Sequence, residues 1–129
     1  MKRDIKYRKV TNVEVVAAKT PEAWKVYLIN HSLDKLENVM ISSKGYGNNG
    51  GEEQRTSVLR HSIPYLDPEM YAMIEPIDAS VFHLTNEYWV SYYIEDQVFD
   101  KKFLFKPHSI SEESLENIKL LSMQGISAN

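Results

Sequence analysis

The stretch Tyr88–Phe105 reads YWVSYYIEDQVFDKKFLF, and it decides the fold class of this chain. Aromatic and β-branched residues, which favour the extended backbone of a strand, fill both of its ends. The short polar break Glu95-Asp96-Gln97 separates the two ends. The pattern therefore predicts a β-hairpin with strands at residues 88–94 and 98–105.

The second strand of this hairpin contains one residue that does not fit its apolar face. Phe99, Phe103 and Phe105 alternate along the strand, and Lys101 stands among them. A β-bulge would explain this lysine. An edge strand that points one charge inward would explain it as well.

The first strand of the hairpin carries aromatic rings on both of its faces. Tyr88 and Tyr92 lie on one face, and Trp89 and Tyr93 lie on the other. One of these faces must pack in the core. We expect packing for the other face too, because aromatic rings supply much of the buried area of a small sandwich. An exposed aromatic ledge is the alternative.

Other β-rich segments follow one another along the chain, with turn residues between them. Trp24–Asn30 is apolar on both alternating faces, which is typical of a central strand covered on both sides. Further strands are predicted at residues 13–18, 38–42, 56–63 and 70–74. The dipeptide Asn49-Gly50 marks the clearest loop, at residues 44–51.

About seven short strands without alternating helices predict an all-β fold, an antiparallel β-sandwich. We favour an immunoglobulin-like Greek key, and a small closed barrel is the alternative.

Because composition is even along the chain, we expect a single β-sandwich domain over residues 1–129, with less regular ends at 1–10 and 107–129. Ser109-Ile110-Ser111-Glu112 resembles a capping box, so we expect an irregular or helical C-terminal tail. A last strand within residues 117–126 is the alternative.

Charge and composition restrict the classes of function. The chain has 129 residues, no cysteine and a formal net charge of −3. Nucleic-acid binding draws on Lys and Arg, so this balance disfavours a nucleic-acid partner. The sequence contains neither a secretory signal nor an apolar run long enough for a bilayer. Together with the missing cysteines, this predicts a cytoplasmic protein without a membrane partner.

No residue spacing in the sequence is typical of a metal centre or a cofactor site. His31, His61, His83 and His108 are far apart, and we expect each to be solvated or hydrogen-bonded. The glycine-rich loop lacks the helix start and the Gly-Lys-Ser/Thr motif of a phosphate-binding loop. We therefore predict no catalytic, cofactor-binding or metal-binding residues, and no cofactor.

One catalytic alternative stays open, a small hydrolase that uses His61 with nearby carboxylates. Ser57, Ser62 and Asp67 lie close to His61 in the sequence. In a strand, however, His61 and Ser62 would point to opposite faces, and no nucleophile-elbow pattern is present. The exposed polar positions of a strand explain these residues equally well.

Four residues around the glycine-rich loop form the candidate partner-binding surface: Lys44, Tyr46, Arg55 and Arg60. If the loop closes a hairpin, they lie on neighbouring strands. Tyr and Arg dominate interaction hot spots, and such a set could hold an acidic or aromatic partner or stack a base. The alternative is a solvated surface whose arginine stems cover apolar neighbours.

We favour a non-catalytic binding or protein-interaction module with an unknown protein or small-molecule partner. A homodimer through a sheet edge is a further prediction.

Five segments, spread over nearly the whole chain, carry a resemblance: Trp24-x-Val26-Tyr27-Leu28-Ile29-Asn30, Leu36-Glu37-Asn38-Val39, Ser43-Lys44-Gly45-Tyr46-Gly47, Asn86-Glu87-Tyr88-Trp89-Val90-Ser91 and Asp100-Lys101-Lys102-Phe103. They resemble a family of short uncharacterised bacterial proteins, some of which carry the label "phenylalanyl-tRNA synthetase alpha subunit". A class II synthetase core needs a longer chain and arginine-bearing ATP motifs that are absent here. The resemblance therefore implies at most an accessory protein linked to tRNA or aminoacylation, and it implies no functional residues.

Overall fold

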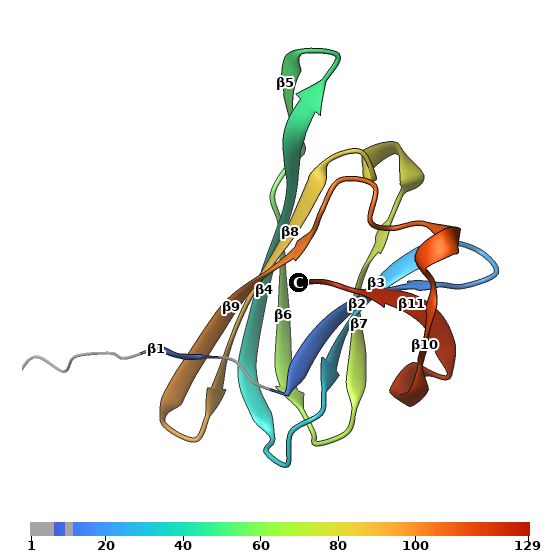
Figure 1. Ribbon diagram of the computed structural model, residues 1–129. Coiled ribbons are helices and arrows are strands. Elements are labelled where there is room, and N and C mark those ends of the chain that lie inside the picture. The colour runs from blue at the N-terminus through green and yellow to red at the C-terminus, as the bar shows by residue number, and fades with distance from the viewer. Residues whose placement is uncertain (1–6, 10–11) are drawn as a thin grey trace, which may run out of the picture.

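The computed structural model describes residues 7–9 and 12–129, and it consists mainly of strands in two layers (Figure 1). No α-helix occurs in these residues, and three 3₁₀ turns connect strands. Seven strands are seven or more residues long, which agrees with the predicted all-β sandwich of about seven strands. The elements in chain order are β1 (Tyr7–Lys9), β2 (Val13–Lys19), β3 (Trp24–Asn30), β4 (Leu36–Asn49), β5 (Glu52–Arg55), β6 (Leu59–Leu66), β7 (Tyr71–Ile77), η1 (Ala79–Val81), β8 (Thr85–Ile94), β9 (Gln97–Phe105), η2 (Glu112–Ser114), β10 (Glu116–Ile118), η3 (Lys119–Leu121) and β11 (Met123–Ser127).

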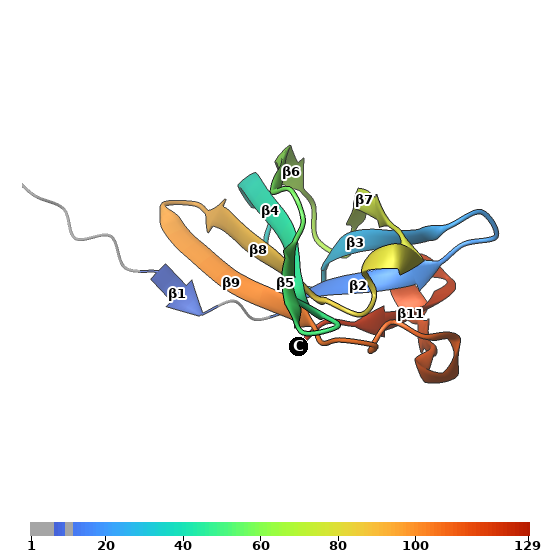
Figure 2. The same cartoon turned by 90° about the horizontal axis from the view of Figure 1, so that it is seen from above.

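The strands form a six-stranded sheet and a five-stranded sheet. The larger sheet has the order β1-β9-β8-β4-β5, with β6 also paired to β4, and the smaller has the order β10-β11-β2-β3-β7. The pair β1–β9 is parallel, and the other pairs are antiparallel. β6 and β7 are edge strands of the two layers and lie on the same side of the molecule (Figure 2).

The core lies between the inner faces of the two sheets, and it contains the tyrosines of the first aromatic face. Tyr88 and Tyr92 are 2% and 1% exposed, and they pack edge-to-face on Phe105 and face-to-face on Phe99. Each fully buried apolar side chain of such a core contributes about 1.5–3 kcal/mol. Other buried members are Val15, Ala17, Val26, Leu28, Leu36, Val39, Ile41, Val90 and Phe103.

The predicted hairpin is confirmed, and its lysine points inward. β8 and β9 pair without a register shift from Asn86 opposite Phe105 to Ile94 opposite Gln97. The bulge alternative is therefore wrong. Lys101 lies opposite the buried Val90, and its Nζ is 4.6 Å from the ring centre of Phe103. β9 is followed in the sheet by the three-residue β1, so the inward charge sits close to the sheet edge.

Most of the loop predicted at residues 44–51 is strand, because residues 44–49 belong to β4. β4 continues to Asn49 and pairs with β5, so that the hairpin turn consists of Gly50 and Gly51. Both glycines have positive φ, 63° and 90°, as this tight turn requires. The loop prediction was wrong because the arm is stabilised by backbone pairing between β4 and β5, and not by buried side chains that would give a sequence pattern. Figure 1 shows it projecting beyond the rest of the sheet.

The outer face of the smaller sheet is covered by the C-terminal tail. Tyr27 and Ile29 pack there with Ile118 and Leu121, so the central strand β3 is covered on both sides as predicted. The tail combines the 3₁₀ turns η2 and η3 with the strands β10 and β11, so both alternatives hold in part. The predicted irregular end at residues 1–10 lies outside the described residues, except for β1. No helix in the described part of the chain has the length and apolarity needed to cross a membrane.

Candidate functional site

The candidate site lies on the outer face of the six-stranded sheet, which is the side away from the core. Along β4, Ile41, Ser43 and Gly45 are buried, whereas Ser42 and Lys44 are more exposed. This alternation is the period-two pattern of a strand. It directs the side chains of Ser42, Lys44 and Tyr46 to the outer face.

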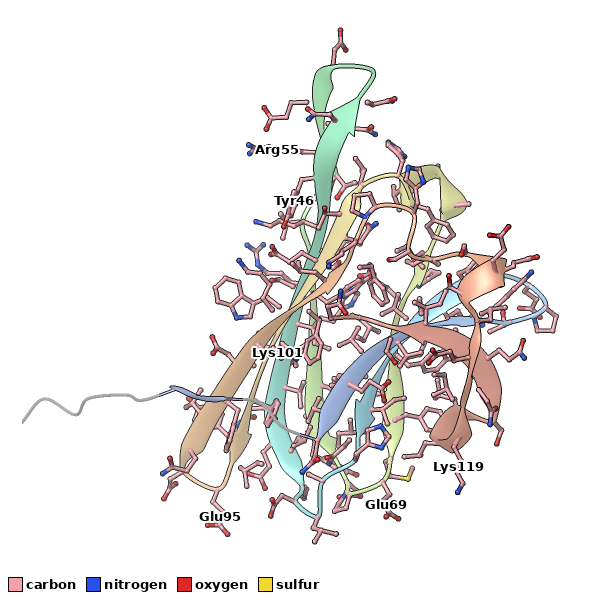
Figure 3. The ribbon with its side chains drawn as sticks, viewed as in Figure 1. Tyr46, Arg55, Glu69, Glu95, Lys101 and Lys119 are labelled. Carbon is pink, nitrogen blue, oxygen red and sulfur yellow. The ribbon has the colours of Figure 1, made fainter. Side chains whose placement is uncertain are left out.

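Strand pairing brings three of the four predicted residues to one end of this face. Arg55 lies directly opposite Tyr46 in the β4–β5 pair, so both side chains point the same way (Figure 3). Lys44 is two residues before Tyr46 on the same strand. The three residues line one open hollow of about 680 Å³, together with Glu87 and Lys102.

Arg60, the fourth predicted residue, lies on the same face but outside that hollow. It is opposite Ser42 in the β4–β6 pair, and Ser42 is opposite Trp89 in the β4–β8 pair. Arg60 and Trp89 line a smaller hollow of about 170 Å³. The structure therefore places the four residues on one face, but in two adjoining hollows.

Glu87 lines the larger hollow, and two lysines compensate its charge. The residue is 4% exposed, and the Nζ atoms of Lys44 and Lys102 lie 3.8 Å from its two carboxylate oxygens. The Tyr46 hydroxyl donates to its Oε1 at 3.2 Å. Burial, the charge of Glu87 and this hydrogen bond together raise the pKa of Tyr46. The tyrosine is therefore held as a neutral hydrogen-bond donor.

Sequence reasoning missed Trp89 and Lys102 as members of this face. Trp89 is 45% exposed and Tyr93 is 40% exposed, so the second aromatic face is a ledge, and the prediction that it packs in a core was wrong. No described element covers these rings. The indole Nε1 of Trp89 donates to Asp100 at 3.2 Å, and the Nζ of Lys102 lies 5.1 Å from the indole. We call Lys44, Tyr46, Arg55, Arg60, Trp89 and Lys102 the basic–aromatic face.

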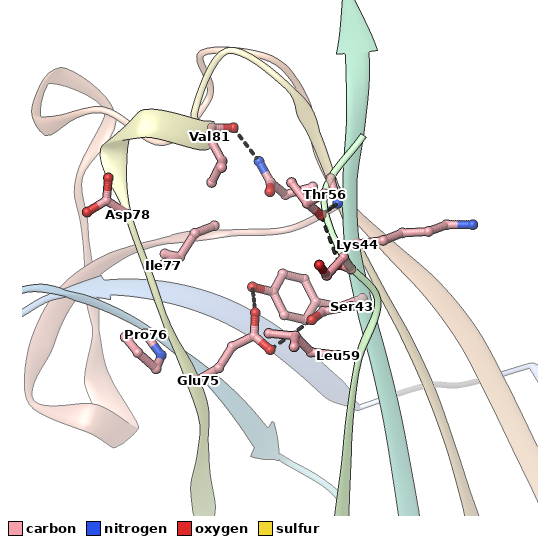
Figure 4. Close-up of a pocket in the computed structure, with 13 residues that line it drawn as sticks. Ser43, Lys44, Thr56, Leu59, Glu75, Pro76, Ile77, Asp78 and Val81 are labelled. Carbon is pink, nitrogen blue, oxygen red and sulfur yellow. Dashed lines mark hydrogen bonds between the residues drawn. The ribbon is translucent and has the colours of Figure 1, made fainter. Parts of the chain in front are cut away.

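A second polar cluster lies on the inner side of the sheet, around Glu75 of β7. Its Oε1 accepts hydrogen bonds from Ser43 Oγ at 2.8 Å and from His61 Nε2 at 2.7 Å. Its Oε2 accepts one from the Tyr88 hydroxyl at 3.0 Å (Figure 4). Burial, followed by the charge of Glu75 and the hydrogen bond to it, raises the pKa of Tyr88 far above the usual tyrosine value. These residues come from β4, β6, β7 and β8.

This inner cluster does not have the geometry of a hydrolase triad. In a triad, the nucleophile bonds to the histidine, and the histidine bonds to the carboxylate. Here Ser43 and His61 both bond to Glu75, so the carboxylate is central and the histidine does not contact the hydroxyl as its base. His61 is also not among the residues that line the adjacent pocket. The arrangement orients Glu75, and it does not activate a serine.

Two of the three remaining histidines, His31 and His83, make separate side-chain contacts. His31 Nε2 lies 2.7 Å from Glu14 Oε2, and His83 Nε2 lies 2.8 Å from Gln54 Oε1. Over residues 7–9 and 12–129, no group of three or more histidine, aspartate or glutamate residues could hold a metal ion. Comparisons with protein-family models, with curated proteins and with solved structures give no match for this chain.

Proposed function

We propose that this protein is a non-catalytic binding module whose basic–aromatic face holds an acidic segment of a partner protein. The observation that carries the proposal is the gathering of cationic and aromatic side chains on a sheet face that no described element covers. We place the module in the cytoplasm, and we propose the immunoglobulin-like Greek key as its topology.

The charges of this face favour an acidic partner, although the whole chain has a net charge of −3. Glu87 is buried and lies between two lysines, so little of its charge reaches solvent. Asp100 accepts the indole hydrogen bond of Trp89, and Glu53 pairs with Arg55 at 2.6 Å. Arg60 forms no ion pair with any described residue and is free to pair with a carboxylate of the partner.

The aromatic members of the face supply the apolar contact that such an interface needs. Trp89 lies beside Arg60 and Lys102, and Tyr93 and Met40 are also 40% and 50% exposed on the same sheet. Trp, Tyr and Arg are the residues that most often dominate binding energy at interfaces. Carboxylates next to an aromatic residue in the partner would match this combination of charge and ring.

Titration with defined polymers tests this proposal. A random Glu/Tyr copolymer should shift the amide NMR signals of β4, β8 and β9, and the binding should weaken as salt rises. A Lys/Tyr copolymer should leave them unchanged. Arg60→Ala with Lys102→Ala should reduce affinity about tenfold or more, whereas the equal charge change Lys106→Ala with Lys119→Ala should not.

Other outcomes of the same titration would overturn the proposal. Signals that do not shift with the acidic copolymer at low salt, or shifts confined to the smaller sheet, contradict it. Salt-dependent binding of tRNA without binding of the copolymer would favour the accessory role that the family resemblance implies. Sedimentation of the same samples tests the predicted homodimer through a sheet edge.

A further inference from the structure

We infer that the pocket beside Glu75 binds a small organic amine, with its ammonium group on the carboxylate and its carbon body against the apolar wall. The pocket measures about 310 Å³ and lies where β7 faces β4, on the inner side of the larger sheet (Figure 4). It shares Lys44 with the basic–aromatic face in its lining, but Glu75 lies on the inner side of the sheet and that face lies on the outer side. The inference therefore does not depend on the proposed function.

The first argument is that Glu75 is a fixed carboxylate without a lysine or arginine partner. Its side chain is 12% exposed, and its partners are the Ser43 and Tyr88 hydroxyls and His61. Lys44 also lines the pocket, but its ammonium group lies 3.8 Å from Glu87 on the outer face. Figure 4 shows the Lys44 side chain directed away from the pocket. His61 compensates this charge only when it is protonated, and a cation from solution would compensate it when the histidine is neutral.

The second argument is that four polar side chains of the wall, Ser43, Thr56, Asn86 and Tyr88, have already used their donors on protein acceptors. The hydroxyls of Ser43 and Tyr88 donate to Glu75, and that of Thr56 donates to the Ser57 carbonyl oxygen at 3.0 Å. The Asn86 amide donates to the carbonyl oxygens of Val81 and Leu84. Each hydroxyl keeps lone pairs, so the wall offers acceptors. A ligand rich in donors fits such a wall.

The third argument is a second carboxylate at the end of β7. Asp78 lines the same pocket, and its Oδ1 accepts a hydrogen bond from the Ser80 amide at 2.8 Å. That hydrogen bond lowers the pKa of Asp78, so the group stays ionised near neutral pH. Two carboxylates therefore attract a cation and repel an anion.

The shape and the apolar wall favour an organic cation over a metal ion. Leu59, Pro76, Ile77 and Val81 line the pocket beside the polar groups. Its volume is at the lower end of the range for small-molecule sites. A bare metal ion would need several oxygen ligands converging on one point, and the described residues form no such group of three. An ammonium group with a body of six to eight carbons satisfies both parts of the wall.

A titration with three molecules of equal size tests the inference. Benzylamine, benzyl alcohol and benzoate are added to the full chain up to about 10 mM, the range in which ligands of this size bind. Benzylamine should shift the amide NMR signals of Ser43, Glu75 and Tyr88, and should bind at least tenfold more tightly than benzyl alcohol. Benzoate should not bind.

Two variants locate the site. Glu75→Gln should abolish the preference for benzylamine over benzyl alcohol, whereas Glu116→Gln, the same change on the exposed β10, should keep it. If Glu75→Gln does not fold, Leu59→Trp keeps the carboxylate, fills the pocket from a half-exposed position and should block binding. Equal affinity for benzylamine and benzyl alcohol, no saturable binding of benzylamine, or unchanged binding in Leu59→Trp would each overturn the inference.

Discussion

Replacing Tyr88 with phenylalanine removes one hydroxyl from the Glu75 cluster and leaves the ring in place. The hydroxyl donates to Glu75 Oε2 at 3.0 Å, and the residue is 2% exposed. A hydrogen bond to a charged group contributes about 1.5–3 kcal/mol. Because Glu75 keeps its bonds from Ser43 and His61, we expect Tyr88→Phe to lower the free energy of unfolding by about 2 kcal/mol at pH 7.

The assay is urea unfolding followed by tryptophan fluorescence, with Tyr92→Phe as the matched control. Tyr92 is as deeply buried as Tyr88, but burial alone raises its pKa, so its hydroxyl is not coupled to a carboxylate. We expect the control to lose less than about 1 kcal/mol. The ring contact of Tyr88 with Phe105, at 5.8 Å between centroids, is kept in the variant.

A double-mutant cycle separates the hydrogen bond from general packing. In a Glu75→Gln background, Tyr88→Phe should cost at least about 1 kcal/mol less than in the native chain, because the charged acceptor is gone. A loss in Tyr88→Phe no larger than in Tyr92→Phe would refute the reasoning. So would a coupling energy of zero between positions 75 and 88.

Two further predictions concern ionisation and packing. Burial raises the pKa of Tyr92 to about 12, against about 10 in the unfolded chain. The stability that the neutral Tyr92 hydroxyl contributes is therefore complete below pH 10, and it is lost as the pH rises from 10 to 12. Between pH 8 and 11.5 the free energy of unfolding from urea titrations should therefore fall by about 2 kcal/mol less in Tyr92→Phe than in the native chain, and equal slopes would contradict this. A Cβ at Gly125 would lie 2.7 Å from Val16 Cγ1 and 2.9 Å from the Ala17 carbonyl oxygen. Gly125→Ala should therefore lower the free energy of unfolding by about 1–3 kcal/mol. Gly50→Asn, at φ 63° with no atom within 4 Å, should leave the thermal midpoint unchanged, and a similar loss in both variants would show that close packing is not the cause.

The fold was predictable where one strand carries its own signal. β3 was predicted at its observed bounds because its apolar residues occupy both faces, and the β8–β9 hairpin because its turn is short and polar. The arm at residues 44–49 was not predictable in this way. Its glycines and asparagines have low β-propensity, and pairing with β5 and β8 holds them extended.

The candidate site was predictable in part, for a related reason. Lys44, Tyr46 and Arg55 come together through one local hairpin, which the turn signal Asn49-Gly50 indicates. Trp89 was missed as a surface residue because the exposure of a strand face depends on whether a second layer covers it. The Glu75 cluster was missed because its members are brought together by the packing of two sheets. Ser43 and Glu75 are 32 positions apart in the chain.

The two sites share one ladder, and that ladder explains why their chemistry differs. In the β4–β8 pair, Ser43 lies opposite Tyr88 and Lys44 lies opposite Glu87, so neighbouring rungs point to opposite faces. A slip of one residue would exchange the two sets, so a single register fixes both sites. On the outer side, Lys44 and Lys102 both lie 3.8 Å from Glu87, and the excess of positive charge there is the reason for proposing an acidic partner. On the inner side, Glu75 has hydroxyl donors and His61 but no lysine or arginine among the described residues, which is why we infer a cationic ligand there.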